Sequence, residues 1–340
     1  MARPIPVLNV YYMFCYAWEA FEHGAELATA AVGAATLLDL VAHVMEAGVR
    51  RLTRRGLDQG YAERTEPLRA LRGAIRVGNS IPLLARRSPS LVCRYDERSL
   101  DVPHNRVVKA ALARLRATAG LDPAIAARLG TLLPTLSGVA DVPLRPEAFR
   151  QVQLYRHNAA YAFLIHLARL VMQAAIPEPG GHGAQFRDVA NDEASMRRVF
   201  EAFVRNLLAR EQRTFAVSSP RLAWDAGPEP GSGMLPGMRL DILLAGAGRH
   251  VIIDTKYTVA STQSHYDRES MRSAHLYQLF AYLVNAEPAI GHAEGILLYP
   301  ADGVAQEYEE VLRGHRVRVA TVDLARPWME VRQALLALAA

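Results

Sequence analysis

Cysteine, lysine and long apolar runs are all scarce in this chain of 340 residues, and each shortage excludes a class of protein. Two cysteines, Cys15 and Cys93, are too few for a disulfide framework. No apolar run approaches the roughly 18–20 residues of a membrane span. The first residues also lack the charged leader, apolar stretch and cleavage site of a signal peptide. We therefore expect a soluble, reduced, cytoplasmic protein that does not contact a membrane.

Lysine is nearly absent although arginine is abundant. Lysine plus arginine amounts to 39 residues, and only Lys109 and Lys256 of these are lysine. Because an ammonium group is compact and a guanidinium is planar, a lysine kept against this bias indicates chemistry that arginine cannot perform. The net charge is +5, and residues 1–180 hold 22 basic and 15 acidic residues, a net of +7. This excess suits an anionic partner, and it equally suits a solvated basic surface.

Length and composition predict a globular protein of roughly two domains. A Pro/Gly-rich stretch over 177–183 is the best candidate boundary. We predict a mixed α/β domain over residues 1–176, a linker over 177–184, and a second α/β domain over 185–340. The order of elements in the second domain favours a central mixed sheet flanked by helices.

Hydrophobic periodicity predicts the individual elements. The expected helices cover about 9–18, 37–45, 107–115, 158–175, 192–212, 268–285 and a last stretch from 327. The expected strands cover about 74–77, 90–95, 239–244, 250–257, 295–299 and 316–322. A basic cluster of Arg50, Arg51, Arg54 and Arg55 stands just before Gly56, where we expect a loop to project it.

Two apolar segments near residue 250 carry acidic residues that a buried strand does not ordinarily hold. Asp241 belongs to the first segment, and Asp254 and Lys256 end the second, beyond a turn that contains Gly246 and Gly248. Alternate residues of a strand share a face, so Asp254 and Lys256 point the same way, and Asp241 can meet them across an antiparallel pair. Buried carboxylates are costly unless they are paired or bound to a cation. Two interpretations follow: a buried salt bridge with Lys256, or a Mg²⁺ site for phosphate chemistry.

Asp241, a hairpin and then Asp254-x-Lys256 together resemble the motif of the PD-(D/E)XK nuclease superfamily. The next helix adds Gln278 and Tyr282, which look like the Gln-xxx-Tyr element of the RecB-like branch. These two residues are four apart and share a helix face. An ordinary amphipathic helix is the alternative interpretation of that pair.

The resemblance extends over nearly the whole chain. Segments 6–18, 52–57, 71–76, 105–109 and 253–257 are similar, in this order, to the McrC family, the nuclease subunits of McrBC 5-methylcytosine-dependent restriction systems. The resemblance implies a DNA endonuclease that acts only with McrB, a AAA+ GTPase that recognises and translocates methylated double-stranded DNA. In this family the McrC subunit enters the McrB ring, stimulates GTP hydrolysis and cuts the DNA.

The chain has no phosphate-loop motif G-x-x-x-x-G-K-[ST]. We therefore expect the chain alone to bind no nucleotide, and we expect the partner to supply the motor. By the resemblance, residues 1–176 are the domain that docks a McrB-like AAA+ GTPase hexamer, and residues 185–340 are the PD-(D/E)XK endonuclease domain.

The resemblance also implies the roles of the central residues. Asp241 and Asp254 would ligate Mg²⁺, or Mn²⁺, and the backbone carbonyl of Thr255 would be a further metal ligand. Lys256 would orient or help to deprotonate the attacking water and would steady the phosphate.

Five further residues are candidate site residues, and each also has an alternative interpretation. Many superfamily members carry an extra acid on the first nuclease helix, and Glu201 is the candidate here; a solvated helix glutamate is the alternative. Gln278 and Tyr282 join it as candidate catalytic residues. His250 and His265 flank the site in the sequence, either to help bind phosphate or as exposed loop histidines.

Two other functions remain open from the sequence. A stand-alone restriction or repair nuclease of the same fold would cut DNA with Mg²⁺ and without a partner. A non-catalytic scaffold that only activates the GTPase would carry a degenerate nuclease domain, against which the intact Asp241, Asp254 and Lys256 argue.

Overall fold

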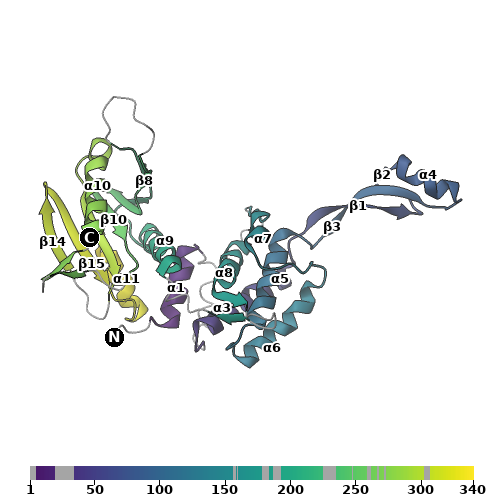
Figure 1. Ribbon diagram of the computed structural model, residues 1–340, viewed down its shortest axis with the longest axis horizontal. Coiled ribbons are helices and arrows are strands. Elements are labelled where there is room, and N and C mark those ends of the chain that lie inside the picture. Colours follow the sequence, from purple (N-terminus) through teal and green to yellow (C-terminus); the bar gives the residue numbers. More distant parts are fainter. Residues whose placement is uncertain are drawn as a thin grey trace. The chain divides into compact units, whose positions relative to one another are not determined.

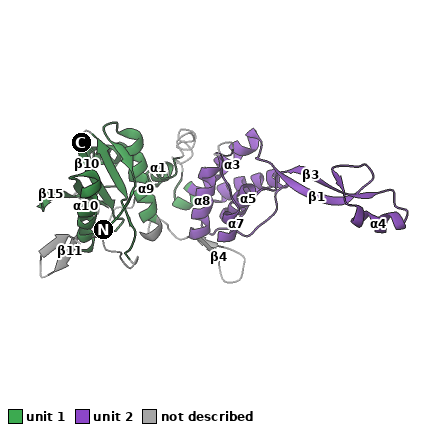
Figure 2. Cartoon of the chain, turned by 90° about the horizontal axis from the view of Figure 1, so that it is seen from above, with its two compact units in different colours: residues 1–40, 188–340 green, residues 41–187 purple. Residues whose placement is uncertain are grey.

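The chain divides into two compact units in the computed structural model (Figures 1 and 2). The first unit consists of residues 1–40 and 188–340, and the second of residues 41–187. Among the described residues, no helix has the length and apolar character needed to cross a membrane. The structure describes residues 5–19, 34–155, 158, 160–177, 184–186, 193–224, 235–246, 248–258, 262–265, 268–271, 273–301 and 307–340.

A six-stranded mixed sheet is the centre of the first unit, and its strand order is β14-β15-β13-β10-β9-β6 (Figure 1). Strands β10, β13 and β15 run parallel, whereas β14, β9 and β6 are antiparallel to their neighbours. The sheet therefore confirms the expected mixed topology. Its strands are β6 (Ala216–Ser218), β9 (Ile242–Gly246), β10 (Arg249–Thr255), β13 (Glu294–Pro300), β14 (Glu307–Leu312) and β15 (His315–Val322). Two short pairs lie outside it: β7 (Arg221–Leu222) with β8 (Met238–Arg239), and β11 (Thr262–His265) with β12 (Arg268–Met271).

The central strands are those whose sequence is continuously apolar. Residues 251–253 of β10 and 296–298 of β13 are buried, as parallel strands covered on both faces require. Strand β14 is different, because its Glu307, Glu309 and Glu310 are exposed at the edge of the sheet. Charge at an edge strand discourages pairing with another chain. The periodicity did not predict β14 because it presents no buried apolar face.

Helices cover the sheet, and α10 packs most closely. Leu279 and Leu283 of α10 contact Gly295 of β13, where an added Cβ would lie 3.0 Å from either leucine side chain. The same face buries Ile252 of β10, so α10 covers the face to which Ile252 points. Among the described residues of this unit, the helices are α1 (Val7–Ala17), α9 (Glu193–Glu211), α10 (Ser273–Ile290) and α11 (Trp328–Ala337).

Helix α1 belongs to the unit that contains the sheet, which corrects the expected division at residues 1–176. The ring of Tyr12 stacks on Trp328 of α11 with centroids 4.5 Å apart. Asn206 of α9 donates a hydrogen bond to the carbonyl oxygen of Tyr16 at 2.9 Å. The dense aromatic and apolar surface of α1 is thus buried against helices that follow it by almost 200 residues or more.

The second unit combines a helical part with a long hairpin that extends from it (Figures 1 and 2). Strands β1 and β3 pair antiparallel from Gly60–Ser99 at the base to Leu68–Leu91 at the far end, where β2 and α4 lie. The unit's elements are α3 (Leu37–Arg55), β1 (Gly60–Leu68), β2 (Ala74–Ile75), α4 (Val77–Ala85), β3 (Leu91–Ser99), α5 (Pro103–Arg116), α6 (Pro123–Leu132), the 3₁₀ helix η2 (Leu133–Leu136), α7 (Pro146–Arg150), α8 (Tyr161–Ala174), β4 (Ala175–Pro177) and β5 (Ala184–Phe186). The expected strand at 90–95 is confirmed within β3, whereas Val77 already begins a helix.

The base of the hairpin is tied to α5 by one side chain. Asn105 donates to the carbonyl oxygens of Asp58 and Leu100, at 2.9 and 2.8 Å, and these residues precede β1 and follow β3. Asp101 and Arg106 add a two-pronged ion pair beside it. The segment 105–109, one of those that carry the family resemblance, therefore anchors both strands of the hairpin.

Lys109, one of the two lysines, has a structural role. Its side chain is buried in α5, and Nζ donates to the carbonyl oxygen of Val139 at 2.6 Å and pairs with Asp141 at 2.9 Å. The compact ammonium ties α5 to the segment after η2. The scarcity of lysine therefore indicated a position that requires a compact ammonium, but Lys109 stabilises the fold and is not placed in the candidate active site.

The arginine cluster that was expected in a loop belongs to the end of helix α3. Arg50, Arg51, Arg54 and Arg55 occupy its last turns, and Arg50 pairs with Glu46 one turn earlier at 2.7 Å. Cations in the last turn of a helix interact favourably with the helix dipole. The cluster does not form a projecting basic loop.

Candidate active site

The two predicted aspartates meet at one end of the β9–β10 pair. Ile242 of β9 pairs with Ile253 of β10, so Asp241 and Asp254 occupy the next position in the same antiparallel register. Asp241 is half-buried, and its Oδ2 accepts hydrogen bonds from the backbone N–H of Thr255 at 2.8 Å and from the Thr255 hydroxyl at 2.9 Å. The strand geometry thus brings the two carboxylates together as the sequence predicted.

Asp254 is the most perturbed acid of the group. Its side chain is 1% exposed, and burial raises its pKa from 3.8 to about 6. The carboxylates of Asp241 and Glu201 also raise this pKa, whereas Lys256, whose Nζ lies 2.7 Å from Oδ2, lowers it. Because the pKa stays raised beside an ammonium, the single lysine does not fully compensate the buried negative charge.

Lys256 is held by a short chain of side chains from helix α10. Its Nζ donates to Oε1 of Gln278 at 2.8 Å, and Nε2 of Gln278 donates to the hydroxyl oxygen of Tyr282 at 2.8 Å. Burial raises the pKa of Tyr282, and the three nearby carboxylates act in the same direction. The structure therefore brings both predicted helix residues into one network with the predicted lysine.

Glu201 comes to this group from α9. Burial raises its pKa, Asp241 adds to the increase, and the cations Arg205 and Arg239 oppose it. Arg205, one turn further along α9, donates to Oε1 of Glu201 at 3.1 Å. Glu201 is therefore a partly buried member of the acidic group, and not a solvated helix glutamate.

Asp241 and Glu201 raise the pKa of Asp254, and Asp241 raises the pKa of Glu201, so negative charge is concentrated where a bound cation would be favoured. Asp241, Asp254 and Glu201 offer hard oxygen donors, which suit Mg²⁺ better than a transition metal. The residues present thus fit the metal that the resemblance implies. The contribution of the Thr255 carbonyl remains a prediction.

His250 lies away from this group. His250 lies four residues before Asp254 on β10, roughly 13 Å away at the ordinary rise of a strand, so it does not flank the site. The side chain of His265 lies outside the described residues.

Sequence reasoning missed the hydroxyl of Thr255 and the two arginines beside Glu201. Arg205 follows Glu201 by four residues, and Arg239 precedes Asp241 by two, so helix and strand periodicity could have indicated both.

Comparisons with known proteins agree with this architecture. Residues 9–300 match the family model described as "McrBC 5-methylcytosine restriction system component". The chain is 28% identical to the Escherichia coli (strain K12) protein named "Type IV methyl-directed restriction enzyme EcoKMcrBC", over 99% of this chain and 98% of that protein. Among solved structures, a chain in the tetradecameric assembly of Thermococcus gammatolerans McrB AAA+ hexamers with bound McrC shares the fold, with a TM-score of 0.58, 18% identity, and coverage of 98% of this chain and 75% of that one. Since the family model spans most of the sequence, the chain belongs to the family of McrBC 5-methylcytosine restriction system components.

Proposed function

We propose that the chain is the DNA endonuclease subunit of a methylcytosine-dependent restriction complex and that it hydrolyses phosphodiester bonds with Mg²⁺. The observation that carries this proposal is the pKa of Asp254, which burial and two neighbouring carboxylates raise to about 6 despite an ion pair with Lys256. A purely structural salt bridge has no need of two additional acids. The family of restriction-system components and the name of the Escherichia coli relative support DNA as the substrate.

Each residue of the site has a role in this reaction. Asp241, Asp254 and Glu201 would hold the divalent cation, and the Thr255 N–H and hydroxyl fix the orientation of the Asp241 carboxylate. When bound, Mg²⁺ would lower the pKa of a water molecule and neutralise charge on the phosphate.

Lys256 orients the attacking water and stabilises the charge that develops on the phosphate oxygens. The hydrogen bond from its Nζ to Gln278 helps to hold the ammonium beside Asp254, and Tyr282 in turn fixes the amide of Gln278. The lysine is therefore placed before DNA arrives.

Lysine substitutions test this role. In the complex with the GTPase partner, Lys256→Ala should abolish cleavage, and Lys256→Arg should also fail, because a planar guanidinium does not replace a point-like ammonium beside water and phosphate. The buried Lys109 provides the matched control: Lys109→Arg alters the other lysine and should leave the chemistry of the cleavage step unchanged. Cleavage at the wild-type rate by either Lys256 variant contradicts the assignment.

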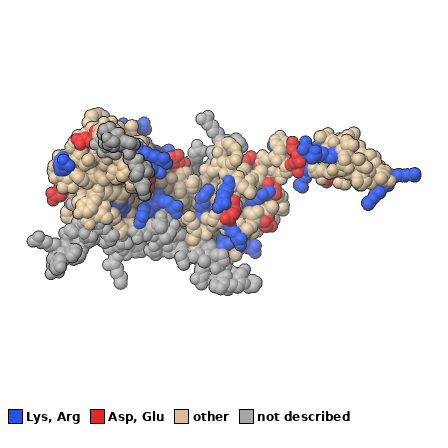
Figure 3. All heavy atoms as spheres, turned by 45° about the horizontal axis from the view of Figure 1, so that its top comes forward, with Lys and Arg blue, Asp and Glu red and all other residues tan. Residues whose placement is uncertain are grey.

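The partner of this subunit is a McrB-like AAA+ GTPase hexamer, as in the Thermococcus gammatolerans assembly of McrB hexamers with bound McrC. We place the docking surface on residues 41–187 and, within them, on the far end of the hairpin. Val77, Ile81 and Leu84 form one stripe of α4 and are 68%, 59% and 55% exposed. The far end of the hairpin, at the right of Figure 3, shows mainly uncharged residues, in tan, with basic side chains at its tip. Apolar residues gathered on an exposed face mark an interaction surface.

Point substitutions test the docking surface in the full chain. Ile81→Asp should weaken binding to the hexamer and lower the stimulated GTP turnover, whereas Val311→Asp, on edge strand β14 and 66% exposed, should do neither. Equal effects of both variants contradict the placement on α4. Robust cutting by the purified chain with Mg²⁺ and no partner supports the stand-alone nuclease instead.

A further inference from the structure

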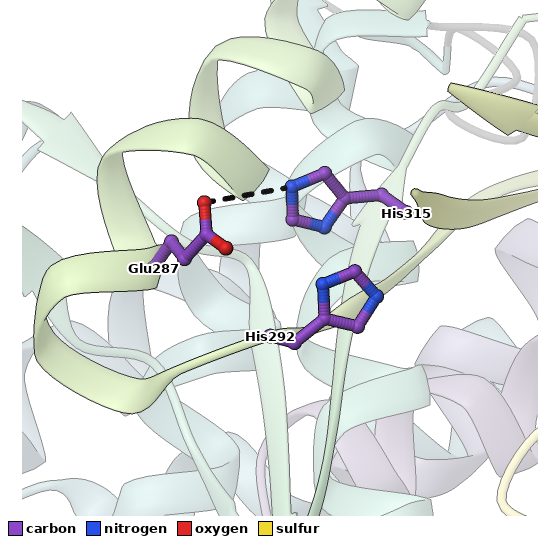
Figure 4. A group of neighbouring side chains, drawn as sticks. All are labelled: Glu287, His292 and His315. Atoms are coloured by element: carbon purple, nitrogen blue, oxygen red, sulfur yellow. Dashed lines mark ion pairs between the residues drawn. The ribbon is translucent and has the colours of Figure 1, made fainter. Parts of the chain in front are cut away.

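A group of side chains of the kinds that ligate metals lies at the other end of the sheet from the acidic group. It consists of Glu287 in the last turn of α10, His292 just before β13, and His315 at the start of β15 (Figure 4). One ligand atom from each of the three residues lies within 4.8 Å of the others. Because β10, β13 and β15 are parallel and Asp254 is near the end of β10, the group at the start of the neighbouring strands is remote from Asp254.

His315 is oriented as a metal ligand would be. The ring is buried, and Nδ1 lies 2.9 Å from the carbonyl oxygen of Ala293. A carbonyl oxygen only accepts, so Nδ1 carries the hydrogen, and Nε2 is left as the ligand atom of the neutral ring. Histidine ligands in metal sites are held by this kind of hydrogen bond through their other ring nitrogen.

The spacing between His315 and Glu287 suits an ion between them. Nε2 of His315 faces the Glu287 carboxylate at 4.0 Å (Figure 4), which is too long for a hydrogen bond. Two ligand atoms on one tetrahedral zinc lie roughly 3.3 Å apart, so a small movement of the exposed glutamate brings both into range.

His292 requires one rearrangement. Its ring stacks on His315, with centroids 4.5 Å apart and planes 8° from parallel. Ring nitrogens bind metal in the plane of the ring, so two parallel rings cannot both direct a nitrogen at one ion. His292 is exposed, and a shared ion would require its side chain to rotate out of the stack so that a ring nitrogen faces the ion.

We propose that Glu287, His292 and His315 bind one Zn²⁺ ion. Two imidazoles and one carboxylate are a donor set typical of zinc and not of Mg²⁺, and water completes the tetrahedron. The ion would tie the end of α10 to the starts of β13 and β15. Helix α10 also carries Gln278 and Tyr282, so this site stabilises the helix that positions Lys256 while remaining separate from the cleavage chemistry.

Zinc titration of the full chain against a fluorescent chelator, in excess Mg²⁺ to occupy the acidic site, tests the proposal. Wild type should bind one high-affinity equivalent, and Zn²⁺ should raise its melting temperature. His292→Ala and Glu287→Gln should each weaken binding at least about tenfold, while His292→Cys, which also offers a zinc ligand, should retain it. Glu330→Gln is the matched control, because Glu287 and Glu330 are both helical and both 54% exposed.

These variants keep the buried His315, so the fold is preserved and circular dichroism checks it. Absence of a high-affinity equivalent in wild type would mean that the group is only an ion pair and would overturn the proposal. Equal zinc affinity of Glu287→Gln and Glu330→Gln, or loss of binding in His292→Cys as complete as in His292→Ala, would overturn it too.

Discussion

Asp254→Asn should stabilise the first unit at neutral pH, and the gain should disappear in acid. The carboxyl of Asp254 has a pKa of about 6 in the folded chain, against 3.8 for an aspartate fully exposed to water, as in the unfolded chain. Between these two values the folded state binds more protons than the unfolded state, so stability falls as pH rises. A difference of about two pKa units at 1.36 kcal/mol each corresponds to roughly 3 kcal/mol above pH 7.

Asparagine resembles the protonated acid in shape and cannot ionise. The variant should therefore exceed wild type by roughly 3 kcal/mol at pH 7.5, and the two free energies of unfolding should converge below about pH 4. Excess Mg²⁺ should recover part of the difference in wild type only, because a bound cation favours the ionised carboxylate.

Urea denaturation, monitored by tryptophan fluorescence, measures the free energy of unfolding of the unit that contains Asp254. All three tryptophans, Trp18, Trp224 and Trp328, belong to the unit that contains Asp254. A stability difference that does not change between pH 4 and pH 7.5 would refute the reasoning, because it would show that the Asp254 carboxyl titrates alike in the folded and unfolded chains.

Three further substitutions test the anchors described above. Lys109→Met leaves the carbonyl of Val139 without its donor and should cost about 1–3 kcal/mol of stability, measured by circular dichroism; an unchanged midpoint contradicts it. Asn105→Ala removes two hydrogen bonds at the base of the hairpin, and amide exchange there should accelerate, with no change in exchange as the opposing result. Tyr282→Phe removes the acceptor for Gln278, so stability should fall by about 1 kcal/mol and cleavage should slow less than in Lys256→Ala; a loss of cleavage as complete as in Lys256→Ala would contradict this.

The parts of the fold that the sequence predicts well are those with continuous apolar runs. Strand β10 follows from such a run, and Asp254 near its end and Lys256 just after it are two residues apart, which places both on one face. Apolar runs do not predict strands β1 and β14, because β1 is largely exposed along the hairpin and β14 is charged at a sheet edge. Apolar periodicity reports burial, and neither strand has a buried face.

Contacts between distant segments are the other part that sequence patterns do not give. Helix α1 was recognised as a buried helix, but its partner, α9, lies almost 200 residues away, so its membership of the sheet unit could not be inferred. The candidate zinc group could not be inferred for the same reason: Glu287 belongs to α10, His292 lies between α10 and β13, and His315 begins β15, with no motif spacing among them. In contrast, Gln278 and Tyr282 were predicted because the pair resembles the Gln-xxx-Tyr element of the RecB-like branch, a motif within a single helix.

Simultaneous measurement of DNA cleavage and GTP hydrolysis by the complete complex tests the central claim most directly. With methylated DNA, Mg²⁺ and the GTPase partner in one reaction, the Asp254→Ala variant should stimulate GTP turnover as wild type does and should leave the DNA uncut. Cleavage at the wild-type rate by this variant would contradict the assignment of Asp254 and its neighbours as the nuclease site.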